Sequence, residues 1–491
     1  MSTRADLGTL EASGLIEIAA LQPELEYLFR HALVQEAAYA SLLKQDRRSL
    51  HRAAAETILA LHPDRARELA GVIGMHLEEA GDTARAAEQL VVAGDHAFER
   101  FANRESLRFF SRAAALADHS QIDLRLRAAI GGGKAGWTYA SSGAELELLQ
   151  NVLANSEEGD KRLVAEANFW LAFLLRQRGE VPESSPELRQ ALERAAQIGE
   201  ELNDPTAAAL PKALMGSFIG FTGKLREGAK QMREALDVIE KTGDAVSIAM
   251  ISDFLALAYS RMGEFKLAEA TISRAMQFAG DGDPISRVDV EIAQAGLALE
   301  RGDSETARRE ALDCAERAEA MGAYACVVVS NVMFGAASLA QNDAPGAKAP
   351  LERGSELCQV TNMAPMQTLL KGLLGSTRAR LGDLPGGTAQ WDSALASARG
   401  MGDRYGEAQT LWGRGRTNAH QASPDLESAL ADLDRAIELF EAMEARPALA
   451  RALHDRARAL SALGRADDSA RDEQRSVQLG RELGLSDMPF A

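Results

Sequence analysis

The residues that could carry chemistry are thinly spread along this chain. Six of its eight histidines stand before residue 120, at positions 31, 51, 62, 76, 96 and 119. No two of them are four residues apart with an intervening glutamate, the spacing that places two zinc-binding imidazoles and a base on one helix face. His31 and Glu36 are five residues apart, a poor spacing for one face, so we expect His31 and Tyr39 to act in packing and hydrogen bonding.

A glycine-rich stretch comes nearest to a phosphate-binding loop. The run from Gly131 to Gly136 lacks the leading glycine, the hydroxyl residue after Lys134 and a preceding strand. We therefore interpret it as a helix break or a loose turn between repeats. Nothing in the sequence resembles a nucleophile elbow, a zinc-protease helix or a calcium-binding loop. The sequence predicts no catalytic residue, no metal ligand and no cofactor site.

The three cysteines point to an intracellular setting. Cys314, Cys326 and Cys358 form no CxxC pair and have no histidine at metal-ligand spacing, so we expect Cys314 to be a buried thiol. No signal peptide opens the sequence, and a reducing cytoplasm is expected. The uncharged stretch 320–341 is interrupted by polar residues such as Asn331 and is interpreted as a buried helix, so no membrane span is expected.

The formal net charge is −18 and is spread along the chain. A nucleic-acid backbone needs clustered Lys and Arg. The nearest such cluster, Lys44, Arg47, Arg48 and Arg52, contains Asp46 and is interpreted as a solvated helix face. The charge pattern therefore predicts no nucleic-acid partner.

The elements that must position any site are indicated by a recurring spacing of small residues. Eight inter-helix turns are predicted to open at Gly81, Gly179, Gly223, Gly263, Gly302, Asn342, Gly382 and Gly464. A Gly or Ala stands seven residues before each turn, and a small residue stands five and again twelve residues after it. We call these the crossing positions. From Gly179 to Gly382 the turns are 44, 40, 39, 40 and 40 residues apart.

The physical reason for this spacing is contact distance. Antiparallel helices whose axes are about 8–10 Å apart need small side chains where they cross. The position seven before a turn lies opposite the one five after it, and the position twelve after it faces the next hairpin. A glycine at the turn adopts a left-handed backbone conformation without a Cβ penalty and ends the first helix.

One unit carries a resemblance to a known family. The segment from Leu255 to Ala268, followed by Ala275, resembles a tetratricopeptide repeat, with leucine, a small residue, tyrosine, glycine, an aromatic and two alanines in that order. The usual period of that family is about 34 residues, and the longer period here lengthens both helices by about a turn. Such degenerate units resemble those of MalT-type regulators. The resemblance covers residues 160–485 well and 61–158 more loosely.

The first sixty residues form a different module. Residues 14–18 and 26–30 are predicted strands joined by a turn at 22–24, and helices are predicted from about His31 and Asp46. The pattern from Phe29 through Tyr39 to His51 resembles a junction in bacterial signal-transduction ATPases of the STAND class. There it joins a winged-helix segment to a tetratricopeptide array, often downstream of a class III adenylate cyclase domain.

The expected fold is therefore all-α, a tetratricopeptide-like right-handed superhelix (an α-solenoid) of about ten hairpins. A small N-terminal β-hairpin, a winged-helix-like remnant, precedes it. The expected units are residues 1–60, 61–158 and 159–491. Between residues 82 and 158 the helix pairing stays open, because Gly94 with Ser106 and Ala113 offers a second register.

A ligand of such an array is expected on the inner face of the superhelix. This face should include the positions ten, six, three and two residues before each turn. They give the candidate inner-face residues Phe169, Phe173, Arg176, Ser217, Phe221, Leu257 and Arg261. A groove of this composition suits an amphipathic peptide with acidic groups. The alternative is that the phenylalanines simply fill the space between repeats.

The sequence thus predicts a non-catalytic protein- or peptide-binding scaffold or sensor region of a bacterial signalling protein. The alternative is the C-terminal regulatory remainder of an adenylate or guanylate cyclase–ATPase polypeptide whose nucleotide-binding and catalytic domains are absent from this chain. The identity of the ligand and the oligomeric state stay open.

Overall fold

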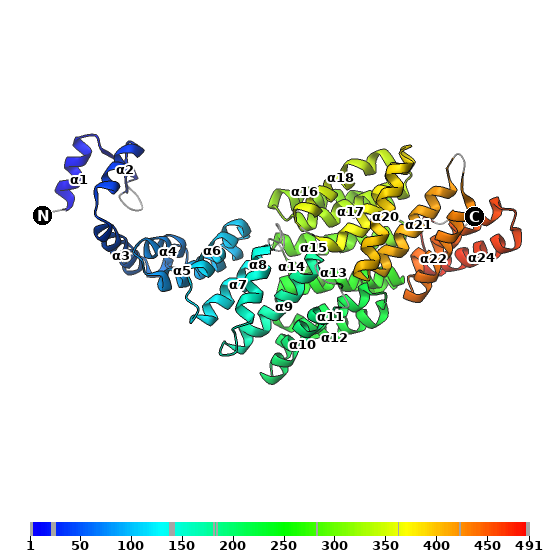
Figure 1. Cartoon of the computed structure of the whole chain (residues 1–491), viewed down its shortest axis with the longest axis horizontal. Coiled ribbons are helices and arrows are strands. Elements are labelled where there is room, and N and C mark those ends of the chain that lie inside the picture. Colours follow the sequence, from blue (N-terminus) through cyan, green and yellow to red (C-terminus); the bar gives the residue numbers. More distant parts are fainter. Residues whose placement is uncertain are drawn as a thin grey trace.

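The computed structural model describes residues 3–20, 26–136, 143–179, 182, 185–280, 283–361, 363–421 and 424–487. Within them the chain forms 24 α-helices, two short 3-10 helices and one two-stranded sheet. The helices stack along an elongated molecule, with α1–α3 at one end and α22–α24 at the other (Figure 1). The predicted all-α solenoid with an N-terminal β-hairpin is confirmed.

The N-terminal module carries the predicted hairpin. Strand β1 (Ile16–Ala20) pairs antiparallel with β2 (Glu26–Phe29), and Ile16 lies opposite Phe29. The predicted turn at 22–24 lies outside the described residues. The module's helices are α1 (Thr3–Ala12), α2 (Ala32–Ser41) and α3 (Lys44–Leu61). Among its described side chains only Ile16 and Ala55 are buried, so the module contributes little to the core.

The remaining helices form the array. The first part holds η1 (Pro63–Arg65), α4 (Ala70–Glu79), α5 (Thr83–Glu99), α6 (Asn103–Leu116), α7 (Ile122–Gly136) and α8 (Gly143–Leu153). The middle holds α9 (Lys161–Arg178), α10 (Pro186–Glu201), α11 (Pro205–Phe221), α12 (Leu225–Ile239), η2 (Glu240–Thr242), α13 (Ala245–Met262), α14 (Phe265–Ala279), α15 (Pro284–Arg301) and α16 (Ser304–Met321). The last part holds α17 (Tyr324–Ala340), α18 (Ala344–Val360), α19 (Ala364–Arg380), α20 (Leu384–Met401), α21 (Arg404–Ala419), α22 (Leu426–Met443), α23 (Arg446–Ala462) and α24 (Ala466–Leu483).

The crossing positions lie where the spacing predicted. Those within the described residues are all buried except Ser469, which is partly exposed; Ser184 lies outside the described residues. A Cβ on Gly228 would lie 2.4 Å from the carbonyl oxygen of Gly216, and one on Gly387 would lie 2.8 Å from that of Gly375. Each pair joins the position seven before a turn to the one five after it. The helix backbones are therefore in contact at these crossings.

The turn prediction is also confirmed. All eight predicted turn residues have a positive φ, between 60° and 95°. A second set of positive-φ residues joins one hairpin to the next, among them Gly243, Gly322 and Gly402. The aspartate after several of these turns, such as Asp303 and Asp403, accepts a hydrogen bond from the first turn of the following helix and caps it.

Three expectations need correction or completion. The glycines 131–133 do not break a helix: they lie buried within α7, where the ring of Phe110 packs so closely on Gly131 that a Cβ there would lie 2.3 Å from it. Both helix pairings left open between residues 82 and 158 occur in the structure. Helix α5 packs on α4 across the turn at Gly81, and it also packs on α6 across a second turn that opens at Phe101. The hairpin of α21 and α22 was missing from the eight predicted turns.

The array coils tightly enough for distant hairpins to touch. Helix α9 packs against α19, and α13 packs against α23. A Cβ on Gly179 would lie 2.2 Å from the Cβ of Ala364, and one on Gly263 would lie 2.5 Å from the side chain of Leu483. The amide of Ser486 donates to the carbonyl of Arg301 at 2.9 Å. The inner face is therefore largely enclosed by protein.

Most of the apolar stretch at 320–341 forms α17, in which 12 of 17 residues are buried in the array. Within the described part of the chain one helix, α13, is long and apolar enough to cross a membrane by length and composition, and 67% of it is buried inside the fold.

Replacing Ala268 by leucine is expected to lower the free energy of unfolding by about 1–3 kcal/mol, because the extra atoms would overpack the α13–α14 crossing. Ala268 is fully buried, whereas Ala270, on the same helix, is exposed. Ala270→Leu is the matched control and should be nearly neutral in chemical denaturation. Equal effects of the two changes would contradict the crossing register.

Candidate functional site

The enclosed inner face holds two adjoining cavities. The larger has a volume of about 310 Å³ and the smaller about 80 Å³. Most of their lining comes from the first helix of successive hairpins, α13, α15, α17, α19, α21 and α23. Six residues line both cavities: Leu257, Arg261, Gly296, Val332, Met333 and Leu369. The cavities are therefore two compartments of one inner channel.

The seven predicted inner-face residues are only partly brought together. The smaller cavity is lined by Phe173, Arg176, Phe221, Leu257 and Arg261. Phe169 lines a third cavity of about 370 Å³, which begins beside the smaller one. Ser217 lines none of these three cavities and donates its hydroxyl to the carbonyl of Leu214 at 2.7 Å.

The two predicted phenylalanines of α9 behave mainly as core residues. Phe169 and Phe173 are 2% and 1% exposed, and both pack edge-on against Trp170 at centroid distances of 5.6 and 5.4 Å. This packing fits the alternative that they fill space between repeats. Phe173 nevertheless contributes to the wall of the smaller cavity.

The two predicted arginines lie over aromatic rings. The guanidinium of Arg176 lies 4.3 Å from the ring centroid of Phe221, and that of Arg261 lies 3.7 Å from the ring centroid of Tyr405. Arg261 is 7% exposed, and its Nε has no hydrogen-bond partner. Asp253 and Asp403 are within electrostatic range of Arg261. Stacking on a ring face stabilises a desolvated guanidinium.

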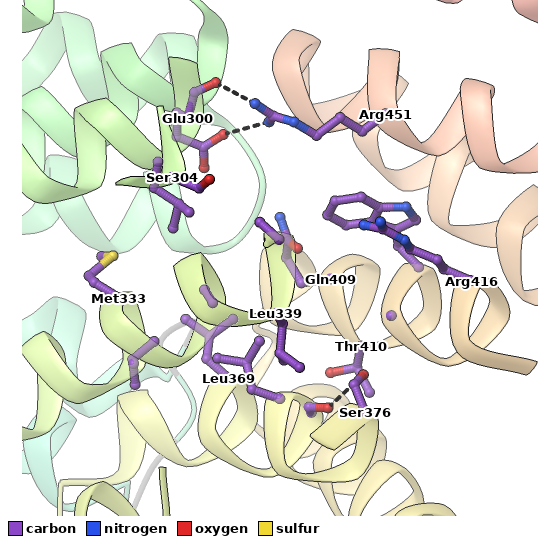
Figure 2. Close-up of a pocket in the computed structure, with 18 of the residues that line it drawn as sticks. Glu300, Ser304, Met333, Leu339, Leu369, Ser376, Gln409, Thr410, Arg416 and Arg451 are labelled. Carbon is purple, nitrogen blue, oxygen red and sulfur yellow. Dashed lines mark hydrogen bonds and ion pairs between the residues drawn. The ribbon is translucent and has the colours of Figure 1, made fainter. Parts of the chain in front are cut away.

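One side of the larger cavity is basic. Arg380 of α19 and Arg416 of α21 both line it, and Arg416 faces the cavity opposite Met333 (Figure 2). Burial, and to a smaller extent the nearby Arg416, lower the pKa of Arg380 to about 10. The carboxylate of Asp455 lies 3.8 Å from Arg416 and accepts from the indole of Trp412 at 2.7 Å. A single carboxylate thus stands beside two guanidiniums.

On the side of the larger cavity near α15, the charged side chains neutralise one another. Arg451 donates to the carbonyl of Glu300 at 2.9 Å and to the carboxylate of Asp487 at 2.7 Å, and its guanidinium lies 3.8 Å from the Glu300 carboxylate. Figure 2 shows Glu300 and Arg451 reaching toward each other from opposite sides. The hydroxyl of Tyr405 donates to Glu300 at 2.7 Å. Burial, and then this carboxylate, raise the pKa of Tyr405.

Two carboxyl groups line the smaller cavity, Asp253 of α13 and Asp289 of α15. Burial, and to a smaller extent the charge of Asp283, raise the pKa of Asp289 to about 7. The pKa of Asp253 is also raised, first by burial and then by Asp289, while Arg261 opposes the shift. Both groups are held in an environment that favours their neutral form.

The fold should therefore lose stability as the pH rises through the pKa of Asp289. With a folded-state pKa near 7 against an ordinary value near 4, the native state binds more protons between these values, so stability falls from about pH 4 to pH 7. Asp289→Asn should raise Tm on the order of a few degrees at pH 8 and less at pH 5. Asp313→Asn, at an exposed site on α16, is the control. A gain that is the same at both pH values would contradict the shifted pKa.

The cysteines are buried, as expected for Cys314. Burial raises the pKa of the Cys314 and Cys358 thiols to about 12, which makes them poor nucleophiles. Across the described ranges, no group of three or more His, Cys, Asp or Glu side chains is placed to hold a metal ion.

No family model matches the chain, and no curated protein matches it. Solved structures do match. A Rap protein complexed with competence and sporulation factor aligns over 75% of this chain and 99% of that one, at 14% identity and a TM-score of 0.50. The APC/C hetero-tetramer Cut9–Hcn1 aligns over 91% of this chain and 88% of that one, at 14% identity and a TM-score of 0.51.

A third similar structure is a signal transduction ATPase with a tetratricopeptide repeat sensor from Pyrococcus horikoshii. The alignment covers 81% of this chain and 59% of the ATPase chain, at 16% identity and a TM-score of 0.46. These neighbours are TPR-like helical repeat proteins. At this identity the likeness shows the fold alone.

Many of the cavity residues that sequence reasoning missed follow the same inner-face rule. The positions ten, six, three and two before a turn were applied only to the turns at 179, 223 and 263. Applied to the later turns they give Glu300, Leu339, Ser376, Arg380, His454 and Arg458, all of which line the larger cavity. The sequence therefore carries the spacing that locates these residues.

Proposed function

We propose that this chain is a non-catalytic scaffold that binds a peptide or protein segment in its inner channel. The segment carries an acidic group, which is recognised by Arg380 and Arg416, and apolar side chains, which fill the rest of the larger cavity. The observation that carries the proposal is the pair of guanidiniums beside one carboxylate in the larger cavity. Like charges held close together in a partly dry site favour binding of an anion.

Two further observations support a peptide or protein ligand. The cavity volume of about 310 Å³ reaches the lower end of the range typical of ligand pockets. Its wall combines aliphatic residues such as Leu339 and Leu369 with Trp412 and the two arginines, the mixture that an amphipathic segment needs. The similar Rap structure is a complex with competence and sporulation factor, and Cut9 forms a hetero-tetramer with Hcn1.

The wider setting is part of the same proposal. The resemblance of residues 255–268 and 29–51 to parts of bacterial signalling ATPases supports a cytoplasmic sensor role, and the acidic net charge supports a partner other than nucleic acid or membrane. An in-frame phosphate-binding loop in the coding DNA upstream of Met1 would support attachment to a cyclase–ATPase polypeptide instead of a separate scaffold.

The test uses a synthetic pool of peptides of roughly three to seven residues, a length that spans up to about 25 Å when extended. Each peptide combines apolar residues with glutamate, and binding to the full chain is measured by equilibrium dialysis and mass spectrometry. We expect retained members whose affinity falls tenfold or more in the variant Arg380→Gln/Arg416→Gln, which loses two charged hydrogen-bond donors.

Arg471→Gln is the matched control, because this arginine is highly exposed on α24 and lies far along the chain from both cavity residues. It should bind the pool as the unaltered chain does. Retention that is equal in the cavity variant, or no retention at all, would refute the proposed function.

A further inference from the structure

The smaller cavity collects hydrogen-bond acceptors. Asp253 and Asp289 both line it. Both aspartates are partly buried, and among the described residues neither carboxyl forms a hydrogen bond or a close ion pair. Gln177 of α9 lines the same cavity, is 7% exposed, and its Oε1 is buried without a hydrogen-bond partner. A buried acceptor without a donor is destabilising unless a ligand supplies one.

The charge that could satisfy these acceptors does not come from the cavity's own arginines. Arg176 and Arg261 stack on the rings of Phe221 and Tyr405, which fixes their guanidiniums against aromatic faces. Arg261 is within electrostatic range of Asp253 without forming an ion pair with it. The smaller cavity itself offers about 80 Å³, and Asp289 also borders the third cavity. A primary ammonium is small, carries three donors and accepts nothing.

The two compartments present different polar groups and are joined by a largely apolar passage, which Arg261 also lines. Of the six residues that line both, Leu257, Val332, Met333 and Leu369 are apolar. Beyond them lie Arg380 and Arg416 on one side and the two aspartates with Gln177 on the other. A ligand that fills the channel therefore meets acceptors at one end and cationic donors at the other.

We infer that the channel binds its peptide in one direction, with a free amino terminus between Asp253, Asp289 and Gln177 and an acidic group at Arg380 and Arg416. This inference rests on the proposed function and adds the polarity of the ligand. A peptide whose amino terminus is blocked loses both the charge and two donors, so it is discriminated against even when its acidic end is unchanged.

The experiment compares two versions of one synthetic pool. The peptides have roughly three to seven residues, an apolar middle and a terminal glutamate, and they are prepared with free amino termini or N-acetylated. Both pools are dialysed against the full chain, the variant Asp253→Asn/Asp289→Asn and the variant Arg380→Gln/Arg416→Gln. We expect acetylation to weaken binding to the unaltered chain about tenfold or more, since charged hydrogen bonds are lost.

The variants separate this inference from the proposed function. In Asp253→Asn/Asp289→Asn the free and acetylated pools should bind alike, whereas Arg380→Gln/Arg416→Gln should weaken both pools. Equal binding of the two pools to the unaltered chain, with the arginine dependence intact, overturns the polarity and leaves the proposed function standing. If neither pool binds to the unaltered chain, both the inferred polarity and the proposed function are overturned. The acetylation comparison needs no substitution, so it stands even if an aspartate variant folds poorly.

Discussion

Replacing Arg451 by alanine is expected to lower the free energy of unfolding by about 3–5 kcal/mol, the typical result of breaking a buried ion pair on one side. Arg451 and Glu300 have side-chain exposures of 13% and 11%. Without the guanidinium, the Glu300 carboxylate keeps the hydroxyl of Tyr405 as a donor but loses its counter-ion. The contacts of Arg451 with Asp487 and the carbonyl of Glu300 are lost as well.

The matched control is Arg446→Ala, because Arg446 lies on the same helix and pairs with Glu482 at 2.6 Å in a more exposed position. Exposed pairs contribute about 0–1 kcal/mol, so this change should be nearly silent. Chemical denaturation followed by circular dichroism measures both variants. If Arg451→Ala is as mild as the control, then the contact between α15 and α23 does not stabilise the coiled array.

Trp391→Ala is expected to cost about 3–5 kcal/mol, because it empties a large, fully buried site. Trp391 lies on α20, and its Nε1 donates to the carbonyl of Gly372 at 3.2 Å. The ring packs on Gly375, where an added Cβ would lie 2.5 Å from Cδ1 of the indole. Gly375→Ala alone should therefore cost about 1–3 kcal/mol by overpacking.

The two substitutions should be strongly coupled. Once the indole is removed, the methyl group of Gly375→Ala has room, so the double variant should lose less stability than the sum of the single variants. Gly400→Ala, in a helical position of α20 where a Cβ meets nothing within 4 Å, is the control and should be neutral or slightly stabilising. Simple additivity in the denaturation cycle would show that the glycine and the indole do not share this space.

Local features of the array could be predicted from the sequence because they depend on short-range contacts. A turn residue such as Gly263 needs a positive φ, and Ala256 and Ala268 lie across one hairpin from each other, within 12 residues along the chain. The small residues of a helix crossing therefore recur at a short, fixed spacing in the sequence. The same locality explains the error at Gly131: the ring that packs on it, Phe110, lies on the preceding helix and was not part of the pattern.

The candidate site could be predicted in part. The inner-face rule found Leu257 and Arg261, which line both compartments, and it would have found Arg380 had it been extended to the later turns. It could not find Tyr405 or Arg451, since neither occupies a position of the rule. Their roles arise from contacts with Glu300, 105 and 151 residues away along the chain.

By itself the sequence determined the class of architecture, the hairpin register, the turn residues and the acidic, repeat-built character of the chain. Only the tertiary structure decided that the superhelix coils tightly enough for α9 to meet α19 and α13 to meet α23, and so encloses a channel. The small rotation between neighbouring hairpins depends on how whole side-chain surfaces pack and accumulates over several repeats. Contacts between hairpins four or more units apart produce no repeating pattern in the sequence. Each such contact is made only once, by residues that do not have to occur in every repeat.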